Sequence, residues 1–481
     1  MSAPRGDEVP AGLVSRAVEI PSPPPRAVLR DARRPRTVWD PSEGPSVVAG
    51  GAAATLETDG PARFDAVREG AESLLAAGDV HAGTEAACPR LFGGFAFHEQ
   101  GSEGAPWSAF PAARFVLPRV QVTYADRGTW LTVTAAGADA DPTTVEARVE
   151  RERERLASLP DPGPTGDPPG IRERVRTTTR ADWRRGVEAA VERIRAGDLR
   201  KVVLAQGLEA RLQREPSLPD VLSRLGETYP DCYRFLVEPV DDSADGDGRA
   251  GGDPSASDDG GVGAGTDGAD GGATDRTGPV PGFFGATPER LVRLHGRTVS
   301  TGALAGTTGR GDTPAEDEWL ARELMNDAKN VHEHELVAEA VRDQLAPFAA
   351  GVRSGERRVR RLATVQHLFT PISATLDEDA HVLDLVEALH PTPAVGGLPP
   401  ERALATIRDS EPFDRGWYAA PVGWFDAAGN GEFAVTIRSA VAEADAVTMF
   451  AGVGIVADSD PDREWDEVQL KYRPILDALE R

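Results

Sequence analysis

The lysines are the residues of this sequence whose placement is most informative about chemistry. There are three, Lys201, Lys329 and Lys471, among 53 basic residues, so arginine supplies nearly all of the positive charge. Arginine can replace lysine as a surface charge, but its guanidinium stays protonated and cannot readily accept a proton. The lysines lie in three dense, non-repetitive motifs, RKVVLAQ, DAKNVHEHELV and EWDEVQLKY. Chance explains any one of them, whereas all three together indicate positions that need an amine or an ammonium.

Lys201 and Glu289 are candidates for proton transfer. Lys201 lies in an apolar, strand-like segment, and burial favours the neutral amine, which can act as a general base. A lysine on an edge strand that points to solvent is the alternative. Glu289, in GATPERL, is either a general acid or an exposed turn residue. Spacing alone does not decide between these interpretations.

Three glutamates are candidates for a metal site. Glu464, Glu467 and Lys471 are spaced by three and four residues and share one face of the predicted last helix. Two carboxylates one turn apart suit a hard divalent cation, and a surface helix with ion pairs is the alternative. Glu333, within HEHE, can complete a carboxylate cage suited to Mg²⁺. Lys329 is one turn from Glu333 and can pair with it. The histidines of HEHE are two residues apart and point to different faces, which disfavours zinc.

The composition limits the class of protein. A net charge of −25 disfavours nucleic acids and anionic membranes as partners. No apolar run approaches the roughly 20 residues of a membrane span, and the N-terminus lacks the apolar core of a signal peptide, so we expect a cytoplasmic protein. Cys88 and Cys232 give no disulfide framework. The acidic excess with little lysine is typical of the surface of a halophilic protein.

A linker rich in proline and glycine, residues 160–170, is the predicted boundary within the chain. Residues 1–45 are rich in proline and arginine and are expected to be loosely ordered, and residues 46–165 form a divergent N-terminal part of the fold. Residues 171–481, which contain all three lysine motifs, are expected to form the catalytic domain.

An acidic insertion interrupts the catalytic domain. Residues 241–278 are rich in aspartate and glycine and contain no aromatic residue, so they cannot bury a core and are predicted to be disordered. They separate two strand-like segments, CYRFLVEP and GFFGATPERLVRL. We therefore expect a hairpin whose loop the insertion enlarges, at little cost in free energy.

Hydrophobic patterns predict the elements that position these residues. The last helix begins at SDPDREW, with Asp460 as its N-cap and Pro461 as its first residue. In the preceding strand, Gly452 and Gly454 leave backbone N–H groups approachable by an anion. Helices mixed with antiparallel strands predict an α+β fold. Helices are expected at 62–77, 143–157, 181–196 and 315–346, and strands at 91–99, 115–125, 200–212, 416–426, 432–442 and 446–455.

Eight segments, in order, resemble the chorismate-utilising enzymes. They are KVVLAQ, FGATPERLV, ALAGTTGRG, KNVHEHELV, LHPTPAVGGLP, EPFDRGWYAAPVGWFD, GEFAVTIRSA and MFAGVGIVADSDPDREWDEVQLKY. The resemblance covers about residues 180–481. The resemblance implies a two-layer α+β fold, with antiparallel sheets packed face to face and helices outside. It also implies chorismate as substrate and Mg²⁺ as cofactor.

Members of this family differ in the nucleophile that they add. Isochorismate and salicylate synthases resemble this chain in having lysine at the position of Lys201, where it deprotonates water. Anthranilate synthases typically have glutamine there and use ammonia. Aminodeoxychorismate synthases carry a lysine within the motif that reads ALAGT here, where this chain has Ala305. The resemblance therefore implies an isochorismate synthase that serves menaquinone biosynthesis and needs no glutaminase subunit, as a monomer or weak homo-oligomer. Salicylate synthase, anthranilate synthase component I and a non-catalytic relative that binds chorismate are the alternatives.

The resemblance also assigns roles by matching position. Lys201 would deprotonate water and Glu289 would protonate the leaving C4 hydroxyl. Glu333 and Glu467 would bind Mg²⁺ directly, with Glu464 acting through water. For His390, a core histidine with satisfied hydrogen bonds is an equally good interpretation. The residues implied to bind the substrate are Gly306, Thr307, His390, Tyr418, Arg438, Gly452, Gly454 and Lys471.

Overall fold

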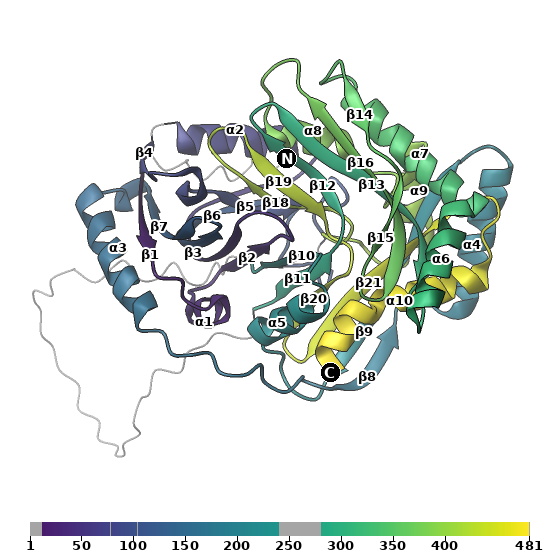
Figure 1. Ribbon diagram of the computed structural model, residues 1–481, viewed down its shortest axis with the longest axis horizontal. Coiled ribbons are helices and arrows are strands. Elements are labelled where there is room, and N and C mark those ends of the chain that lie inside the picture. The colour runs from purple at the N-terminus through teal and green to yellow at the C-terminus, as the bar shows by residue number, and fades with distance from the viewer. Residues whose placement is uncertain (1–11, 77, 103, 240–279, 481) are drawn as a thin grey trace, which may run out of the picture.

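The computed structural model describes residues 12–76, 78–102, 104–239 and 280–480 (Figure 1). Within these residues, 21 strands form one hydrogen-bonded, branched sheet, and the helices lie on its outer faces. All strand pairs among the described residues are antiparallel except β1 (Leu13–Ile20) with β4 (Gly78–His81). The predicted α+β class is confirmed. No helix in the described part of the chain is long and apolar enough to cross a membrane.

The N-terminal segment forms regular structure from residue 13 onward. β1 pairs along its whole length with β7 (Gly128–Ala136), and β2 (Arg36–Asp40) pairs with both β3 (Ser46–Thr58) and β10 (Tyr233–Val237). The expectation of a loosely ordered segment was wrong for residues 13–45. Its prolines are concentrated in the short connection to α1 (Pro25–Asp31), where Pro25 occupies the first turn.

The sheet divides into two layers at β6 (Ala113–Ala125). One branch leaves β6 through β3 and the other through β5 (Leu91–Phe95). Aromatic side chains from both layers pack together, including Phe110 and Phe283 against Trp417. The first branch continues through β2, β10, β11 (Gly282–Thr287), β20 (Ser439–Glu443), β21 (Ala446–Ile455) and β9 (Lys201–Leu212), and the second through β18 (Pro421–Phe425), β19 (Gly431–Val435), β12 (Arg290–His295), β13 (Thr298–Gly309) and β16 (Val365–Thr375).

The remaining elements extend the sheet edges or cover its faces. The C-terminal helix α10 (Pro461–Glu480) packs on β21, and α7 (Ala328–Leu345) packs on β13 and β16. The other strands are β8 (Ile171–Arg176), β14 (Val352–Ser354), β15 (Arg358–Arg361) and β17 (Gly397–Leu398), and the other helices are α2 (Arg63–Leu75), α3 (Pro142–Ala157), α4 (Arg180–Arg195), α5 (Leu218–Thr228), α6 (Pro314–Asn326), α8 (Val382–Leu389) and α9 (Pro400–Ser410).

The predicted hairpin around the acidic insertion is confirmed. β10 and β11 pair from Tyr233 with Thr287 to Val237 with Phe283. The insertion itself, 241–278, lies outside the described residues. The division of the chain at 160–170 stays a prediction, and the pairs β2–β10 and β5–β18 join strands from either side of that linker.

The long helix predicted at 315–346 is two helices, so this prediction was wrong. Asp327 has an extended backbone (φ −70, ψ 116) and ends α6. Its carboxylate accepts a hydrogen bond from the Asn330 backbone N–H at 2.8 Å, so the same residue caps α7. The break places Lys329 in the first turn of α7.

Two of the predicted C-terminal strands are shorter than expected. Ala419 (φ 61) and Arg438 (φ 55) adopt the left-handed conformation, which side chains other than glycine rarely take. Because of the turn at Ala419, β18 begins only at Pro421. The turn at Arg438 separates β19 from β20. The strand expected at 446–455 and the N-cap at Asp460 are confirmed, since Asp460 accepts from the Arg463 backbone N–H at 3.0 Å.

Candidate active site

Most of the predicted site residues line one cavity, where β21 faces β13 between the ends of α7 and α10. Lys201, at the start of β9, and Glu464, on α10, are absent from the lining but pair with residues around it. The lining includes Glu289, Gly306, Thr307, Glu333, Tyr418, Arg438, Gly452, Gly454, Glu467 and Lys471, together with His367.

The three lysines of the chain pair one-to-one with the three predicted metal glutamates. The N–O distances are 3.0 Å for Lys201 with Glu333, 2.7 Å for Lys329 with Glu464 and 2.7 Å for Lys471 with Glu467. Lys329 therefore reaches across to α10 instead of pairing with Glu333 on its own helix. The six charges cancel, which lets carboxylates and ammonium groups share a buried region.

Lys201 is buried, with 1% of its surface exposed, so the alternative of a solvent-facing edge lysine was wrong. It begins β9, and its neighbours Val202 and Val203 pair with Ile455 and Gly454 of β21. A Cβ at Gly454 would collide with the Glu333 carboxylate and lie 2.8 Å from Lys201 Cε. A glycine at this position therefore leaves the space in which the Lys201–Glu333 pair forms.

Glu289 lies in the turn between β11 and β12 and is buried. Burial raises its pKa to about 7, although the charges of Lys201 and Arg438 oppose the shift. A carboxylic acid with such a pKa is partly protonated at neutral pH and can donate a proton. The alternative of an exposed turn residue was wrong.

Tyr418 and Arg438 come from the two irregular segments beside β18 and β20. The Tyr418 ring stacks on Phe450 with a centroid distance of 5.4 Å. Arg438 is buried and forms no ion pair with any residue in the described ranges. Its left-handed backbone is a strained conformation of the kind found at functional sites. A buried guanidinium without a protein partner suits a carboxylate of a ligand.

The β13 side of the cavity has a bulge at Gly306. This glycine has φ +76, and a Cβ there would lie 3.1 Å from the Asn330 carbonyl oxygen. Its neighbour Thr307 donates its backbone N–H to Asn330 Oδ1 at 3.2 Å, and its hydroxyl lies 3.0 Å from His367 Nδ1. This hydrogen bond connects the bulge of β13 to the first turn of α7. The metal candidate Glu333 lies on the next turn of the same helix.

A scan against protein-family models gives one decisive match: the model described as "Chorismate binding enzyme" matches residues 6–244 and 278–480. The chain belongs to the chorismate-binding enzyme family. Its match to this family includes the N-terminal part, for which the sequence motifs gave no signature.

Several curated relatives are similar over most of this chorismate-binding enzyme. It is 34% identical to the isochorismate synthase MenF of Bacillus subtilis, over 81% of this chain and 74% of the relative. It is 35% identical to the salicylate biosynthesis isochorismate synthase of Pseudomonas aeruginosa, over 97% of this chain and 90% of the relative.

Solved structures share the fold. The Escherichia coli menaquinone-specific isochorismate synthase MenF superposes with a TM-score of 0.75 at 24% identity, covering 99% of this chain and 97% of that one. A 2,3-dihydroxybenzoate-specific isochorismate synthase, DhbC, from Bacillus anthracis superposes with a TM-score of 0.70 at 25% identity. The superposition covers 95% of this chain and 99% of that one. The predicted two-layer fold of chorismate-utilising enzymes is confirmed.

His390 does not line the cavity of this family member. Its Nε2 lies 3.2 Å from the Phe97 carbonyl oxygen, and its ring packs edge-on against Phe97 with centroids 5.7 Å apart. Burial lowers its pKa to about 3. These contacts favour the alternative of a core histidine.

The histidine of the cavity is His367, which sequence reasoning missed. It is buried on β16, directly opposite Thr307, and its Nε2 has no hydrogen-bond partner among the described residues. Burial lowers the pKa of His367, so its imidazole is neutral at neutral pH. Only the β13–β16 register reveals its position, since the segment TVQHLF reads as an ordinary strand.

The carboxylates of the site fit a hard cation by chemistry, but they do not converge on one. Within the described ranges, no group of three or more His, Cys, Asp or Glu side chains surrounds a common metal position. Each glutamate instead turns toward its lysine. Burial raises the pKa of Glu464, whereas Lys471, Lys329 and Arg438 together lower that of Glu467, although partial burial opposes this shift. Oxygen donors of this kind are those that Mg²⁺ prefers.

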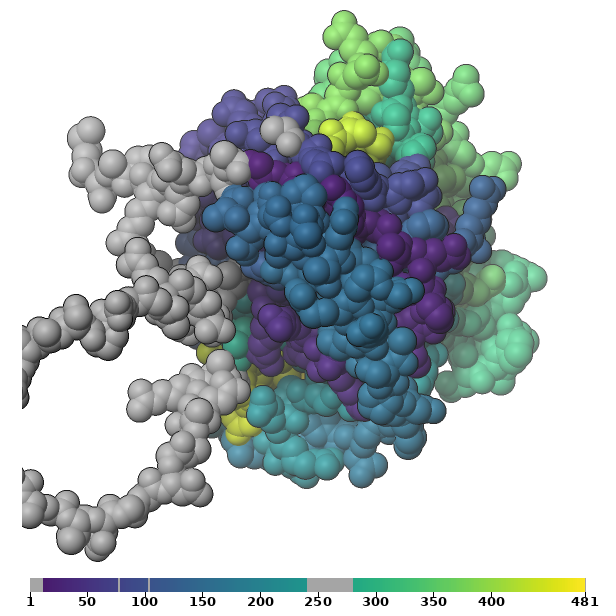
Figure 2. Space-filling view, turned by 90° about the vertical axis from the view of Figure 1, so that its left-hand side faces the viewer, coloured from purple at the N-terminus to yellow at the C-terminus, as the bar shows by residue number. Residues whose placement is uncertain are grey.

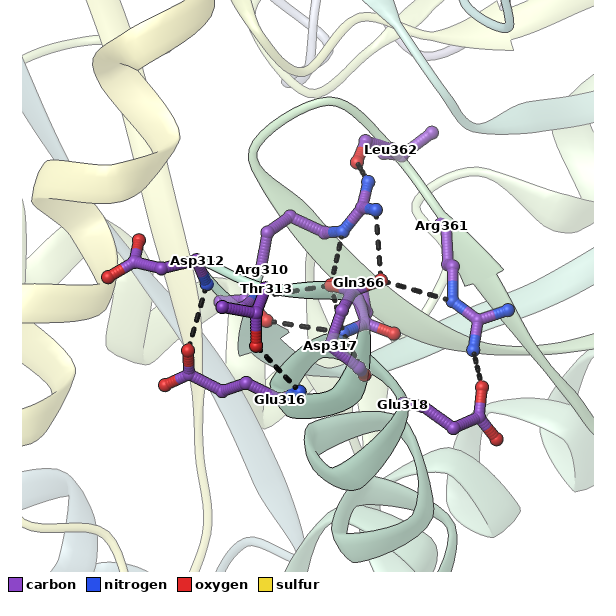
Figure 3. Close-up of polar contacts among 11 residues, drawn as sticks. Arg310, Asp312, Thr313, Glu316, Asp317, Glu318, Arg361, Leu362 and Gln366 are labelled. Carbon is purple, nitrogen blue, oxygen red and sulfur yellow. Dashed lines mark hydrogen bonds and ion pairs between the residues drawn. The ribbon is translucent and has the colours of Figure 1, made fainter.

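A separate polar cluster fixes the corner at which β13 leads into α6 (Figure 3). Arg310 forms a two-point ion pair with Asp317, with N–O distances of 2.6 and 2.9 Å. The same carboxylate accepts from Gln366 Nε2 at 3.0 Å and from the Gly311 backbone N–H at 3.0 Å. Asp317 therefore ties α6 to the ends of β13 and β16, the strands that carry Thr307 and His367.

Proposed function

We propose that the chain is an isochorismate synthase, which adds water at C2 of chorismate and expels the C4 hydroxyl to give isochorismate. The observation that carries this proposal is a buried lysine, Lys201, beside the same cavity as a glutamate, Glu289, whose pKa is about 7. Water addition needs a base, and ammonia addition does not. Relatives named isochorismate synthase, at 34% and 35% identity, support the same activity.

The two groups would act as base and acid in one exchange. Lys201, as the neutral amine, takes a proton from water while the water oxygen forms its bond to C2. Both ring double bonds shift, C1=C2 to C1=C6 and C5=C6 to C4=C5. The C4–O bond breaks, and Glu289 gives its proton to the departing hydroxyl, which leaves as water. Lys201 then carries the extra proton and Glu289 has lost one, so each must exchange a proton before the next turnover.

Arg438 and Tyr418 would hold the pyruvyl carboxylate of the substrate. The Arg438 guanidinium has no protein partner among the described residues, and a carboxylate can accept two hydrogen bonds from it. Gly452, Gly454, Gly306 and Thr307 would line the substrate. Lys471, which donates to the Gly452 carbonyl at 2.9 Å, keeps α10 against β21.

Glu333 and Glu467 would hold Mg²⁺ directly, and Glu464 through water, in place of their lysine partners. Mg²⁺ supplies positive charge that offsets the ring C1 carboxylate and withdraws electrons from the ring. The three glutamates are otherwise neutralised, so the dication and the dianionic substrate would enter a site of balanced charge.

Salicylate synthase, which goes on to eliminate pyruvate, would use the same residues. Anthranilate synthase component I is disfavoured by Lys201. We further propose that the enzyme acts in the cytoplasm, at high salt, and supplies isochorismate for menaquinone.

The test is product analysis. Purified protein is incubated with chorismate and Mg²⁺ at high salt, with and without ammonia, and the products are separated by liquid chromatography. Isochorismate without salicylate or pyruvate is expected. Salicylate with pyruvate would show the salicylate synthase reaction, anthranilate would show ammonia addition, and the absence of any product would contradict the proposal.

A further inference from the structure

A second cavity lies on the other side of the molecule from the catalytic cavity. It is enclosed by α3, by the end of α1 and by the paired strands β3 and β6. Figure 1 shows α3 at the left and the helices α7 and α10 of the catalytic cavity at the right, and Figure 2 looks onto α3, in blue, beside the purple N-terminal segments. We call it the arginine pocket after its five arginines, Arg33, Arg119, Arg148, Arg151 and Arg155.

The arginines reach the pocket from three elements. Arg148, Arg151 and Arg155 are spaced by three and four residues and share one side of α3, beside the buried face formed by Val145, Val149 and Leu156. Arg151 is exposed, at the rim of the pocket. Arg119 lies on β6 opposite Gly51 of β3, which has φ +68, and the register of the two strands shifts just beyond it, between Ala52 and Ala54. A Cβ at Gly51 would lie 3.3 Å from Arg119 Cβ. The glycine thus allows the Arg119 side chain to cross the strand.

The protein balances only part of the charge of the pocket. Glu152 is the single carboxylate among the lining residues, and Arg155 pairs both with it, at 2.6 Å, and with Asp31 at the end of α1. Arg119 pairs with the exposed Asp139 at 3.3 Å. Arg33, Arg148 and Arg151 have no ion-pair or side-chain hydrogen-bond partner within the described ranges. This concentration of positive charge stands out in a chain with a net charge of −25.

Arg148 shows the imbalance most directly. Its Nη1 is buried and has no hydrogen-bond partner in the described structure. Burial lowers its pKa, and the neighbouring charges of Arg119, Arg151 and Arg33 lower it further, although the charge of Asp139 opposes the shift. An unpaired buried donor beside like charges is unfavourable, so an anion placed there would gain both hydrogen bonds and charge compensation.

The floor of the pocket is apolar. It is formed by side chains of α1, β3 and β6, chiefly Val28, Val48, Val120 and Val122. Inorganic phosphate would gain nothing from such a floor, whereas a ligand with a hydrocarbon body would bury it there. The arrangement therefore has two parts, an apolar base and a cationic rim.

We propose that the arginine pocket binds a small organic anion, an apolar body that carries a carboxylate or a phosphate. The acidic group would lie between Arg148, Arg151 and Arg33, and the body would lie on the valines. The mechanism proposed above uses none of these residues, so the site is separate from the catalytic one and the proposal does not depend on the reaction.

The test uses anilinonaphthalene sulfonate, a fluorescent anion with an apolar body, titrated into the full-length protein. We expect saturable binding to one site in the wild type. The double substitution Arg148→Gln with Arg151→Gln should weaken binding by about tenfold or more, which is about 1.4 kcal/mol. The control, Arg185→Gln with Arg322→Gln, removes the same charge from exposed positions on α4 and α6 and should leave binding within about twofold.

Relief of repulsion should leave the unfolding temperature of the pocket variant at or above that of the wild type, so lost binding will not reflect lost folding. Benzoate and phenyl phosphate, titrated separately, should displace the dye, and the tighter of the two identifies the acidic group. The proposal is overturned if the wild type shows no saturable site, if the pocket variant binds as well as the wild type, if the control loses binding equally, or if neither competitor displaces the dye.

Discussion

Lys201 Nζ lies 3.0 Å from Glu333 Oε1, so the candidate base and a candidate metal ligand are ion-paired with each other. The two side chains have room to pair because residue 454 of β21 is a glycine, and a Cβ there would collide with both of them. In the proposed function this pair would link proton transfer to metal binding, because Mg²⁺ would compete with Lys201 for the Glu333 carboxylate.

Replacement of Lys201 by glutamine should abolish water addition. The variant keeps a hydrogen-bonding side chain but has no proton acceptor, so we expect kcat to fall by roughly 10²- to 10⁴-fold. Lys201→Arg should be as inactive, because it restores the charge without the base. Steady-state rates of isochorismate formation check both variants, and turnover near the wild-type rate in either one would remove Lys201 from the role of base.

The alkaline limb of the pH profile should belong to Glu289. An acid must be protonated to act, and the pKa of Glu289 is about 7, so kcat/KM should fall as the pH rises above about 7. Glu289→Gln should lower the rate by roughly 10²-fold or more and remove that limb. An alkaline limb that persists unchanged in the residual activity of Glu289→Gln would assign it to another group.

The same shift predicts the stability of the protein against pH. The pKa of Glu289 is higher in the folded than in the unfolded chain, so its contribution to stability is complete below its usual pKa of 4.5 and is lost as the pH rises through about 7. In denaturant unfolding from about pH 4 to about pH 8, the wild type should lose more stability with rising pH than Glu289→Gln does. Parallel curves would contradict a raised pKa.

Gly454→Ala should impair catalysis more than folding. The new Cβ would meet the ends of two flexible side chains, Glu333 and Lys201, which can move aside and so break their pair. We expect a folded protein with a strongly reduced kcat. Gly351→Ala is the matched control, since a Cβ there meets nothing within 4 Å. Equal activities of the two variants would show that the close packing at Gly454 is not needed.

Removal of metal should stop turnover without unfolding the protein. Each of the three glutamates has its own lysine at 3.0 Å or less, so no uncompensated carboxylate is left in the metal-free protein. Chelation should abolish isochorismate formation, Mg²⁺ should restore it, and the unfolding temperature should change little. Activity that survives exhaustive chelation would exclude the metal, and a large fall in unfolding temperature would contradict compensation by the lysines.

The sequence indicated which residues gather around the cavity, but it did not indicate which of them pair with each other. Lys201 was singled out because lysine is rare in this chain, and Glu289 and Glu333 because they lie in dense motifs. The pairing of Lys329 with Glu464 could not be predicted, because it depends on how α7 and α10 approach each other. His367 was missed for the same reason: only strand register places it opposite Thr307.

The fold shows the same division between local and long-range information. The elements α4 and β9 were predicted within a residue or so, since their hydrophobic patterns are regular. The strands β1 and β2 were missed because the proline-rich connection between them dominates the local composition. The breaks at Asp327 and Arg438 were missed because an extended or left-handed residue at one position leaves no periodic signal.

The central claim, that water is the nucleophile and Lys201 its base, is tested most directly by isotope labelling. Chorismate is converted in water enriched in the heavy oxygen isotope, with Mg²⁺, by the wild type and by Lys201→Gln, and the product is analysed by mass spectrometry. We predict one heavy oxygen atom, in the C2 hydroxyl of isochorismate, from the wild type and no labelled product from the variant. Isochorismate without the heavy isotope, or labelled product from Lys201→Gln at the wild-type rate, would contradict the claim.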